Sequence, residues 1–243
     1  MTLVLAAHGT RDARGEAVLR DLAEAVRARR PGHRVHLAHL EISRPLLSSA
    51  LPGLPGPVTI VPLLLAGGYH AHVDLPEIVS RTRPDARLAR PLGPHPLLSR
   101  ALARRLAEAG LRPDDAVVLA AAGSSDPAAL ADVRAQARLL SVRLGRPVTA
   151  AFAASGTPAF AASGTPALPR EWGRRTALAS YLLAPGFFHT RFQHSGAALV
   201  SAPIGADPSL AALIWRRFDD VQRARKCQPT HHHDRMTSTR PAG

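Results

Sequence analysis

The chain has 243 residues, of which 46% are hydrophobic and 20% charged, a composition typical of a soluble globular protein. No apolar run approaches the roughly 20 residues that a membrane helix needs, so we expect no membrane span. The formal charge of +13 is almost all arginine and is not arranged as a basic stripe interleaved with aromatics, which favours a solvated basic surface or an anionic small ligand over nucleic acid.

Strands alternate with helices along the first part of the chain. The apolar run Leu3–Ala7 ends in a turn at His8–Thr10, and Val18, Leu22 and Val26 then repeat at the four-residue spacing of a helix. The other elements expected here are strands over 35–40 and 58–65 and a helix that starts near Pro76. This alternation predicts βαβ units and a parallel sheet.

The same pattern recurs in the second part of the chain. Residues 3–12 resemble residues 117–126, residues 34–39 correspond to 147–152, and residues 63–70 parallel 182–189. We therefore predict an α/β fold of two pseudo-symmetric halves, 1–112 and 113–222, each a parallel sheet flanked by helices, with a cleft between them. The verbatim repeat of 152–159 as 160–167 is interpreted as a loop duplication, and the polar residues 223–243, which include His231–His233, as a disordered tail.

Three side chains that can bind a metal follow three successive strands. His8 follows the first strand, Glu41 the second and His70 the third. Because ligands of an open parallel sheet bind beyond the carboxyl ends of its strands, we expect these groups at one rim. Two imidazoles and a carboxylate suit a borderline divalent ion such as cobalt, iron, nickel or zinc. A single histidine after a strand is more often a turn or capping residue, so the hypothesis rests on all three together.

Three motifs surround these side chains. They are His8-Gly9-Thr10-Arg11-Asp12, Leu40-Glu41 followed by Pro45, and Gly68-Tyr69-His70-Ala71-His72-Val73-Asp74-Leu75-Pro76. They resemble the motifs of the sirohydrochlorin chelatases, the CbiX-type class II chelatases of cobalamin and sirohaem synthesis. The resemblance spans most of residues 1–220 and is sharpest in the first half.

The resemblance implies an activity and a set of roles. It makes His8 and His70 the metal-binding histidines and Glu41 the accompanying acid, with His72 as a polar residue of the rim. The implied enzyme is a lyase that inserts Co²⁺ or Fe²⁺, with Ni²⁺ as a further candidate, into a sirohydrochlorin-type tetrapyrrole. It needs neither ATP nor a permanently bound cofactor, and Glu41 or a histidine free of metal would accept the pyrrole protons. Long members of the family hold both halves in one chain, so we expect a monomer.

The second half lacks most of these groups. Ala122 stands at the position of His8, Ala154 lies near that of Glu41, and His189 remains as the counterpart of His70. We therefore expect one active half that faces a degenerate half. Candidate contacts to the anionic tetrapyrrole are Arg11, Arg44, Ser124, Ser125 and His189, each of which could equally be a solvated, buried or capping side chain.

Two other functions fit parts of the pattern. A phosphohistidine enzyme of the mutase type also has a histidine–glycine pair after its first strand, but that class usually has an arginine where this chain has Ala7. A non-catalytic metal-binding or metal-delivery protein of the same fold would need no second lobe to clamp a planar ligand. Residues 1–5 lack the features of a signal peptide and Cys227 is the single cysteine, so we expect a cytoplasmic protein.

Overall fold

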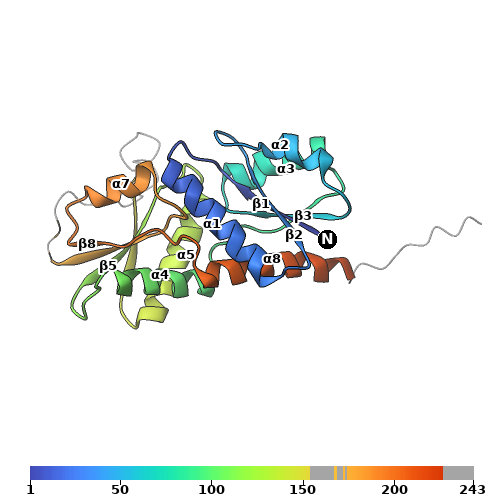
Figure 1. Cartoon of the computed structure of the whole chain (residues 1–243). Coiled ribbons are helices and arrows are strands. Elements are labelled where there is room, and N and C mark those ends of the chain that lie inside the picture. The colour runs from blue at the N-terminus through green and yellow to red at the C-terminus, as the bar shows by residue number, and fades with distance from the viewer. Residues whose placement is uncertain (154–166, 169–171, 173, 227–243) are drawn as a thin grey trace, which may run out of the picture.

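The computed structural model describes residues 1–153, 167–168, 172 and 174–226, and its strands form two parallel four-stranded sheets (Figure 1). The strand order is β2-β1-β3-β4 in one sheet and β6-β5-β7-β8 in the other. Two sheets of equivalent order confirm the predicted α/β fold of two similar halves.

The first half has a central strand that is buried along its whole length. Its elements are β1 (Thr2–Ala7), α1 (Ala13–Arg29), β2 (Arg34–His39), α2 (Leu47–Ala50), η1 (Leu51–Gly53), β3 (Val58–Pro62), η2 (His70–Asp74), α3 (Leu75–Thr82), β4 (Arg87–Leu88) and α4 (Pro96–Glu108). β1 lies between β2 and β3, and Leu3 and Leu5 pack on one face of the sheet while Val4 and Ala6 pack on the other. Both faces of a parallel sheet are covered in this way, which explains why β1 reads as an uninterrupted apolar run.

The third strand is shorter than expected, and a π-helical turn precedes the next helix. β3 ends at Pro62 rather than near residue 65. Leu63 N–H still donates to β1, at the Ala6 carbonyl, but the Leu64 carbonyl accepts from Leu92 instead, so the chain leaves the sheet there. The helix expected near Pro76 is α3, which has that proline in its first turn and follows directly on η2.

The second half repeats this order with local differences. Its elements are β5 (Ala116–Ala121), α5 (Pro127–Leu144), β6 (Val148–Phe152), β7 (Thr176–Ser180), α7 (Phe187–Gln193), β8 (Leu199–Val200) and α8 (Pro208–Lys226). The turn after the first strand has the same geometry in both halves, because Gly9 has φ +105° and Gly123 has φ +104°. Asp12 and Asp126 then cap α1 and α5 by accepting the N–H two residues on, at 2.9 and 2.8 Å. The repeat seen in the sequence is therefore a structural repeat.

The last helix of each half packs on the other half. α4 contacts α5 and β7 of the second half, whereas α8 contacts α1 and β3 of the first. Two hydrogen bonds of 2.7 Å join the Arg30 guanidinium to the Asp219 carboxylate of α8, and the indole N–H of Trp215 donates to the Val26 carbonyl at 3.0 Å. One apolar core runs through both halves. We therefore propose that the halves 1–112 and 113–222 exchange their last helices.

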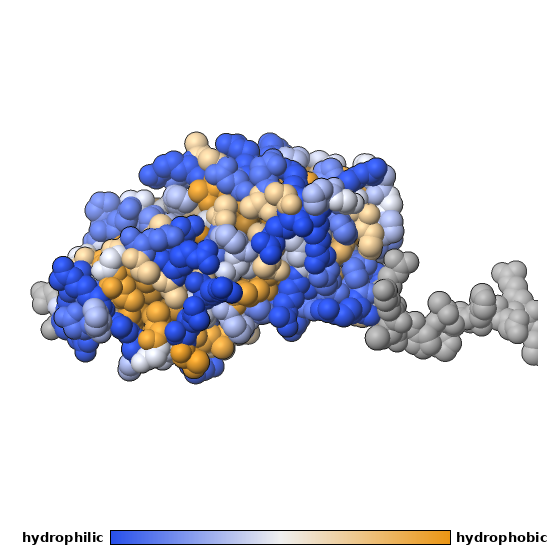
Figure 2. Space-filling model, turned by 60° about the horizontal axis from the view of Figure 1, so that its bottom comes forward, coloured by the Kyte–Doolittle hydropathy of each residue, from blue (hydrophilic) through white to orange (hydrophobic). Residues whose placement is uncertain are grey.

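Some expectations fall at the limits of the described residues. α8 continues to Lys226, so residues 223–226 are helical and not part of a tail, while 227–243, Ala154 and most of the duplicated loop lie outside the described residues. Among the described residues, no helix is long and apolar enough to cross a membrane. On the face shown in Figure 2, hydrophilic side chains surround apolar patches that are most extensive toward the second half.

The start of α4 predicts a pH-dependent contribution to stability. His95 accepts the Leu97 N–H on Nδ1 at 3.1 Å, and burial, reinforced by Arg217, lowers its pKa from 6.5 to about 4. Because burial disfavours the protonated ring in the folded state, the stability that neutral His95 contributes is complete above pH 6.5. It is lost as the pH falls toward 4. His95→Asn keeps a capping side chain but does not titrate, so the unchanged chain should lose about 1–3 kcal/mol more than this variant between pH 7 and 4. Urea unfolding at several pH values across that range measures the difference. Free energies of unfolding that change equally with pH in the two proteins would contradict the prediction.

Candidate metal centre and adjoining cleft

The turn after β1 carries His8 and depends on a glycine. A Cβ on Gly9 would lie 2.0 Å from the Glu41 carbonyl oxygen and 3.1 Å from the Ser43 nitrogen, and the positive φ of this residue is also unfavourable for other residue types. Gly9 therefore lets the loop after β1 lie directly against the loop after β2.

Backbone hydrogen bonds extend the pairing of β1 and β2 beyond the strands. Leu40 N–H donates to the Ala7 carbonyl at 2.8 Å, and Glu41 N–H donates to the His8 carbonyl at 3.1 Å. The buried Ser43 hydroxyl then accepts from Thr10 N–H at 3.1 Å and donates to the Thr10 carbonyl at 3.0 Å. These bonds hold His8 and Glu41 side by side. Ser43 is not among the residues predicted for the site, since its role depends on the contact between two loops.

His70 begins the π-helical turn η2, and Asp74 ends it. The Asp74 Oδ2 atom lies 2.5 Å from His70 Nδ1, which orients the ring and leaves Nε2 available. A carboxylate on the far nitrogen of an imidazole is the usual support of a metal-binding histidine. Asp74 lies in the third sequence motif without a predicted role, and its spacing of four residues from His70 is the signal that indicates this contact.

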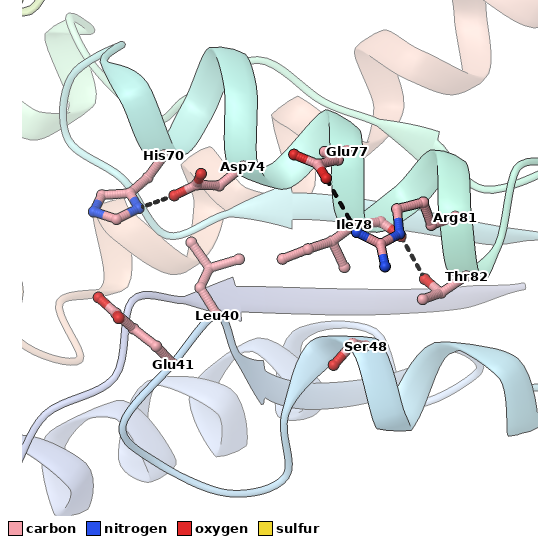
Figure 3. Close-up of a pocket in the computed structure, with 9 residues that line it drawn as sticks. All are labelled: Leu40, Glu41, Ser48, His70, Asp74, Glu77, Ile78, Arg81 and Thr82. Carbon is pink, nitrogen blue, oxygen red and sulfur yellow. Dashed lines mark hydrogen bonds and ion pairs between the residues drawn. The ribbon is translucent and has the colours of Figure 1, made fainter.

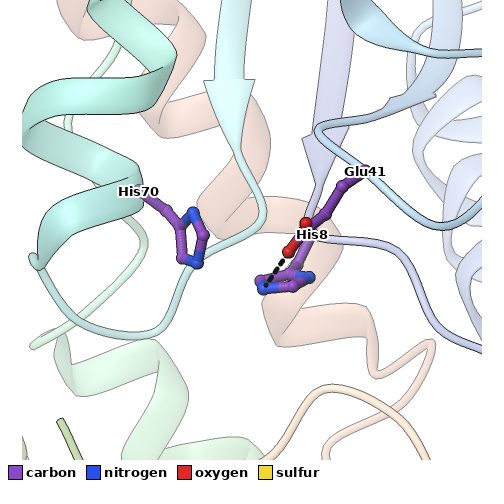
Figure 4. Close-up of side chains that lie close together, drawn as sticks. All are labelled: His8, Glu41 and His70. Carbon is purple, nitrogen blue, oxygen red and sulfur yellow. Dashed lines mark ion pairs between the residues drawn. The ribbon is translucent and has the colours of Figure 1, made fainter.

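The three side chains meet at the carboxyl ends of β1, β2 and β3. The candidate ligand atoms of His8, Glu41 and His70 all lie within 4.8 Å of one another (Figure 4). His8 Nε2 is 3.1 Å from Glu41 Oε1, and the two imidazole rings cross at 77° with their centroids 4.5 Å apart. Each side chain is partly exposed, so an ion could enter without displacing the core. His72 is exposed and lies outside this cluster.

A cleft of about 930 Å³ opens beside His8, between the two halves. Its walls include residues 7–12 and 63–65 of the first half and residues 181–189 of the second, with Ala122 at the position equivalent to His8. The lining is mostly apolar, and its volume is in the range of sites that enclose small organic ligands. The cleft expected between the halves is thus present and reaches one edge of the cluster of His8, Glu41 and His70.

A smaller cavity of about 340 Å³ lies on the other side of the cluster, between α2 and α3 (Figure 3). Glu41 and His70 line it at one end, together with Asp74. Farther along, Glu77 of α3 accepts from Arg81 at 3.1 Å. The candidate metal centre therefore lies between two hollows, one apolar and one bordered by carboxylates.

The candidate substrate contacts occupy different places. Arg11 and His189 line the cleft. Ser124 lines a separate cavity of about 120 Å³ and accepts from Asp126 N–H at 3.1 Å, while Ser125 and Arg44 are exposed and line neither of these cavities.

His189 differs from its counterpart His70 in its hydrogen bonding. Its Nε2 lies 3.2 Å from the Ser201 carbonyl, within the second half. Burial lowers the pKa of His189, so the ring is neutral near pH 7 and donates to that carbonyl. In the first half His8 lies beside His70, whereas Ala122 stands at the position equivalent to His8 in the second half. His189 therefore has no second imidazole beside it there.

Comparisons with known proteins support the two-half fold. Residues 2–109 match the family model CbiX, and no curated protein matches the chain. The structure of SirB from Bacillus subtilis with Fe³⁺ is 23% identical in sequence to this chain and gives a TM-score of 0.75. The match covers 93% of this chain and 97% of the SirB chain. The sirohydrochlorin chelatase SirB from Bacillus subtilis subspecies spizizenii in complex with cobalt shares 20% identity with the same coverage and a TM-score of 0.74.

A third similar structure is described as CbiX, the terminal enzyme for biosynthesis of sirohaem in denitrifying bacteria. It shares 22% identity, covers 90% of this chain and 99% of its own, and gives a TM-score of 0.64. At these identities, the similarity establishes the two-half fold across nearly the whole chain.

Proposed function

We propose that this chain, which belongs to the CbiX family through residues 2–109, is a metal chelatase that inserts Co²⁺ or Fe²⁺ into a sirohydrochlorin-type tetrapyrrole. The observation that carries the proposal is the cluster of His8, Glu41 and His70 at the edge of a cleft walled by both halves. A metal site alone would serve storage or delivery. A metal site that borders a large apolar cleft also provides a place for an organic acceptor of the ion.

The two imidazoles hold the metal substrate in this proposal. His70 would bind through Nε2, because Asp74 occupies Nδ1. His8 would bind through the nitrogen that now faces Glu41 Oε1 at 3.1 Å. Two imidazoles with water or a carboxylate bind such ions without enclosing them, so the ion can be passed to a competing ligand.

Glu41 is the proposed proton acceptor. Insertion of a divalent ion releases two pyrrole N–H protons, and a base near the ion is needed to accept them. When His8 Nε2 binds the ion it no longer pairs with Glu41, and the carboxylate is then free beside the metal. One proton would pass to Glu41 and the other to solvent, which reaches this half-exposed side chain.

The cleft provides the proposed macrocycle site. Leu63–Leu65 and Leu182–Ala184 give apolar walls from opposite halves, and Phe187 is 70% exposed at this site. Arg11 is the proposed partner for a substrate carboxylate, and His189 a contact from the second half.

Absorbance spectroscopy tests the proposal under anaerobic conditions. Sirohydrochlorin mixed with the protein should give the spectrum of the metallated macrocycle once Co²⁺ or Fe²⁺ is added, at a rate proportional to protein concentration. A metal-delivery protein would bind the ion and leave the rate at its uncatalysed value. That outcome would overturn the proposed catalysis.

A further inference from the structure

The segment between β3 and His70 is held by the second half of the chain. The Tyr181 hydroxyl donates to the Leu65 carbonyl at 2.7 Å, and the Gly67 N–H donates to Asp132 Oδ2 at 2.8 Å. Tyr181 follows β7 and Asp132 lies on α5, so both groups cross from the half that lacks the metal-binding cluster. His70 follows three residues after Gly67.

Glycines are packed tightly at both contacts. A Cβ on Gly93 would lie 2.1 Å from the Leu65 oxygen and 2.2 Å from the Tyr181 hydroxyl oxygen. A Cβ on Gly67 would lie 2.5 Å from His72 Nε2 and 3.3 Å from Asp132 Oδ2. Tyr181 is 3% exposed, and burial raises the pKa of its hydroxyl, which therefore remains a donor. The Leu65 backbone and the Tyr181 hydroxyl thus pack closely against Gly93, and the His72 and Asp132 side chains pack closely against Gly67.

These contacts run in one direction only. When the two halves are matched, Asp132 corresponds to Val18 in the sequence repeat. Tyr181 corresponds to Leu63, because their N–H groups donate to the equivalent carbonyls of Ala120 and Ala6. Neither Val18 nor Leu63 has a polar side chain, so the first half cannot return the same bonds to the second. The half without the metal cluster therefore supplies the polar support, and the half with the cluster receives it.

We propose that Asp132 and Tyr181 are positioning residues for His70, so that the degenerate half acts on the metal centre as well as covering the cleft. The Gly68 carbonyl accepts from Ala71 and His72, each at 2.9 Å, so the turn that carries His70 begins immediately after the anchored Gly67. Metal ligands must be held within about 0.5 Å of their required positions, and fixing the start of this turn limits the movement of the ring. The inference rests on the proposed function, because it assumes that His70 binds the metal.

Titration of the full chain with Co²⁺, followed by the visible absorption of the bound ion, tests this proposal. Asp132→Ala and Tyr181→Phe should each weaken Co²⁺ binding about tenfold, the size expected for one hydrogen bond that fixes a ligand, and should shift the absorption band. Asp132→Asn keeps an oxygen that can accept from Gly67, so it should restore most of the affinity. Asp114→Ala, at an exposed position of the same half, is the matched control and should bind like the unchanged chain.

A second background separates positioning from general damage to the fold. In His70→Ala, residual affinity measured at millimolar Co²⁺ should not fall further when Asp132→Ala is added, because the ligand that it positions is gone. An equal loss in both backgrounds, or unchanged affinity and spectrum in Asp132→Ala and Tyr181→Phe, would overturn the positioning role alone. If the unchanged chain bound no Co²⁺, or if His70→Ala bound it as tightly, the proposed metal site would itself be wrong.

Discussion

Alanine at His8 or at His70 should lower Co²⁺ affinity and the rate of metal insertion at least about a hundredfold, because losing even an outer contact of a metal ligand typically costs 10–100-fold. Each substitution leaves a single imidazole to hold the ion, with the Glu41 carboxylate beside it. Both side chains are partly exposed at strand ends, so the fold should persist. Anaerobic Co²⁺ titration and the insertion assay measure the effect, with circular dichroism to confirm folding.

His194→Ala is the control for removing a histidine as such. His194 is exposed after α7, where its Nδ1 lies 2.8 Å from the Thr190 carbonyl, and it is not part of the proposed metal-binding cluster. The His194→Ala variant should bind Co²⁺ and catalyse metal insertion like the unchanged chain. Full insertion activity in either His8→Ala or His70→Ala would refute the assignment of that residue, whatever the control shows.

The placement of these side chains could be reasoned from sequence because parallel strands impose it. β1 pairs with β2 in a register that sets Ala7 opposite His39, so His8 and Glu41 are brought to the same edge by the ladder itself. β3 lies on the other side of β1 and delivers its following loop to that edge as well. Apolar runs reveal the strands and the strands determine which residues follow them.

Contacts that depend on how loops and halves dock could not be reasoned in this way. Nothing in the sequence distinguishes Ser43 from the other serines. Its role follows from its two hydrogen bonds to Thr10 in the loop after β1. Asp132 sits on a helix whose orientation toward Gly67 is set by packing between the halves. Sequence periodicity shows which face of a helix is apolar but not which element that face packs against. The proposed exchange of α4 and α8 could therefore not be predicted from the sequence either.

Gly9→Ala should damage both stability and the metal site. At φ +105°, a residue with a side chain is strained, and its Cβ would meet the Glu41 carbonyl oxygen at 2.0 Å. Backbone strain of this kind costs about 1–3 kcal/mol, and relief of the clash requires the two loops to separate, so we expect a loss of about 2–4 kcal/mol in the free energy of unfolding. Gly9 directly follows His8, so separation of the loops displaces the His8 ring, and Co²⁺ affinity should fall more than about tenfold.

Gly123→Ala makes the comparison informative, because Gly123 has φ +104° at the equivalent turn of the second half. It imposes the same backbone strain beside Ala122 rather than beside His8, the proposed metal ligand. Unfolding curves should therefore show destabilisation in both variants, whereas Co²⁺ titration of the folded proteins should show weakened binding only in Gly9→Ala. Equal Co²⁺ affinity in the two variants would mean that the contact between the loops after β1 and β2 does not position the cluster. A difference confined to metal binding would show that two turns of the same shape serve the fold equally, while one of them also carries the ligand geometry.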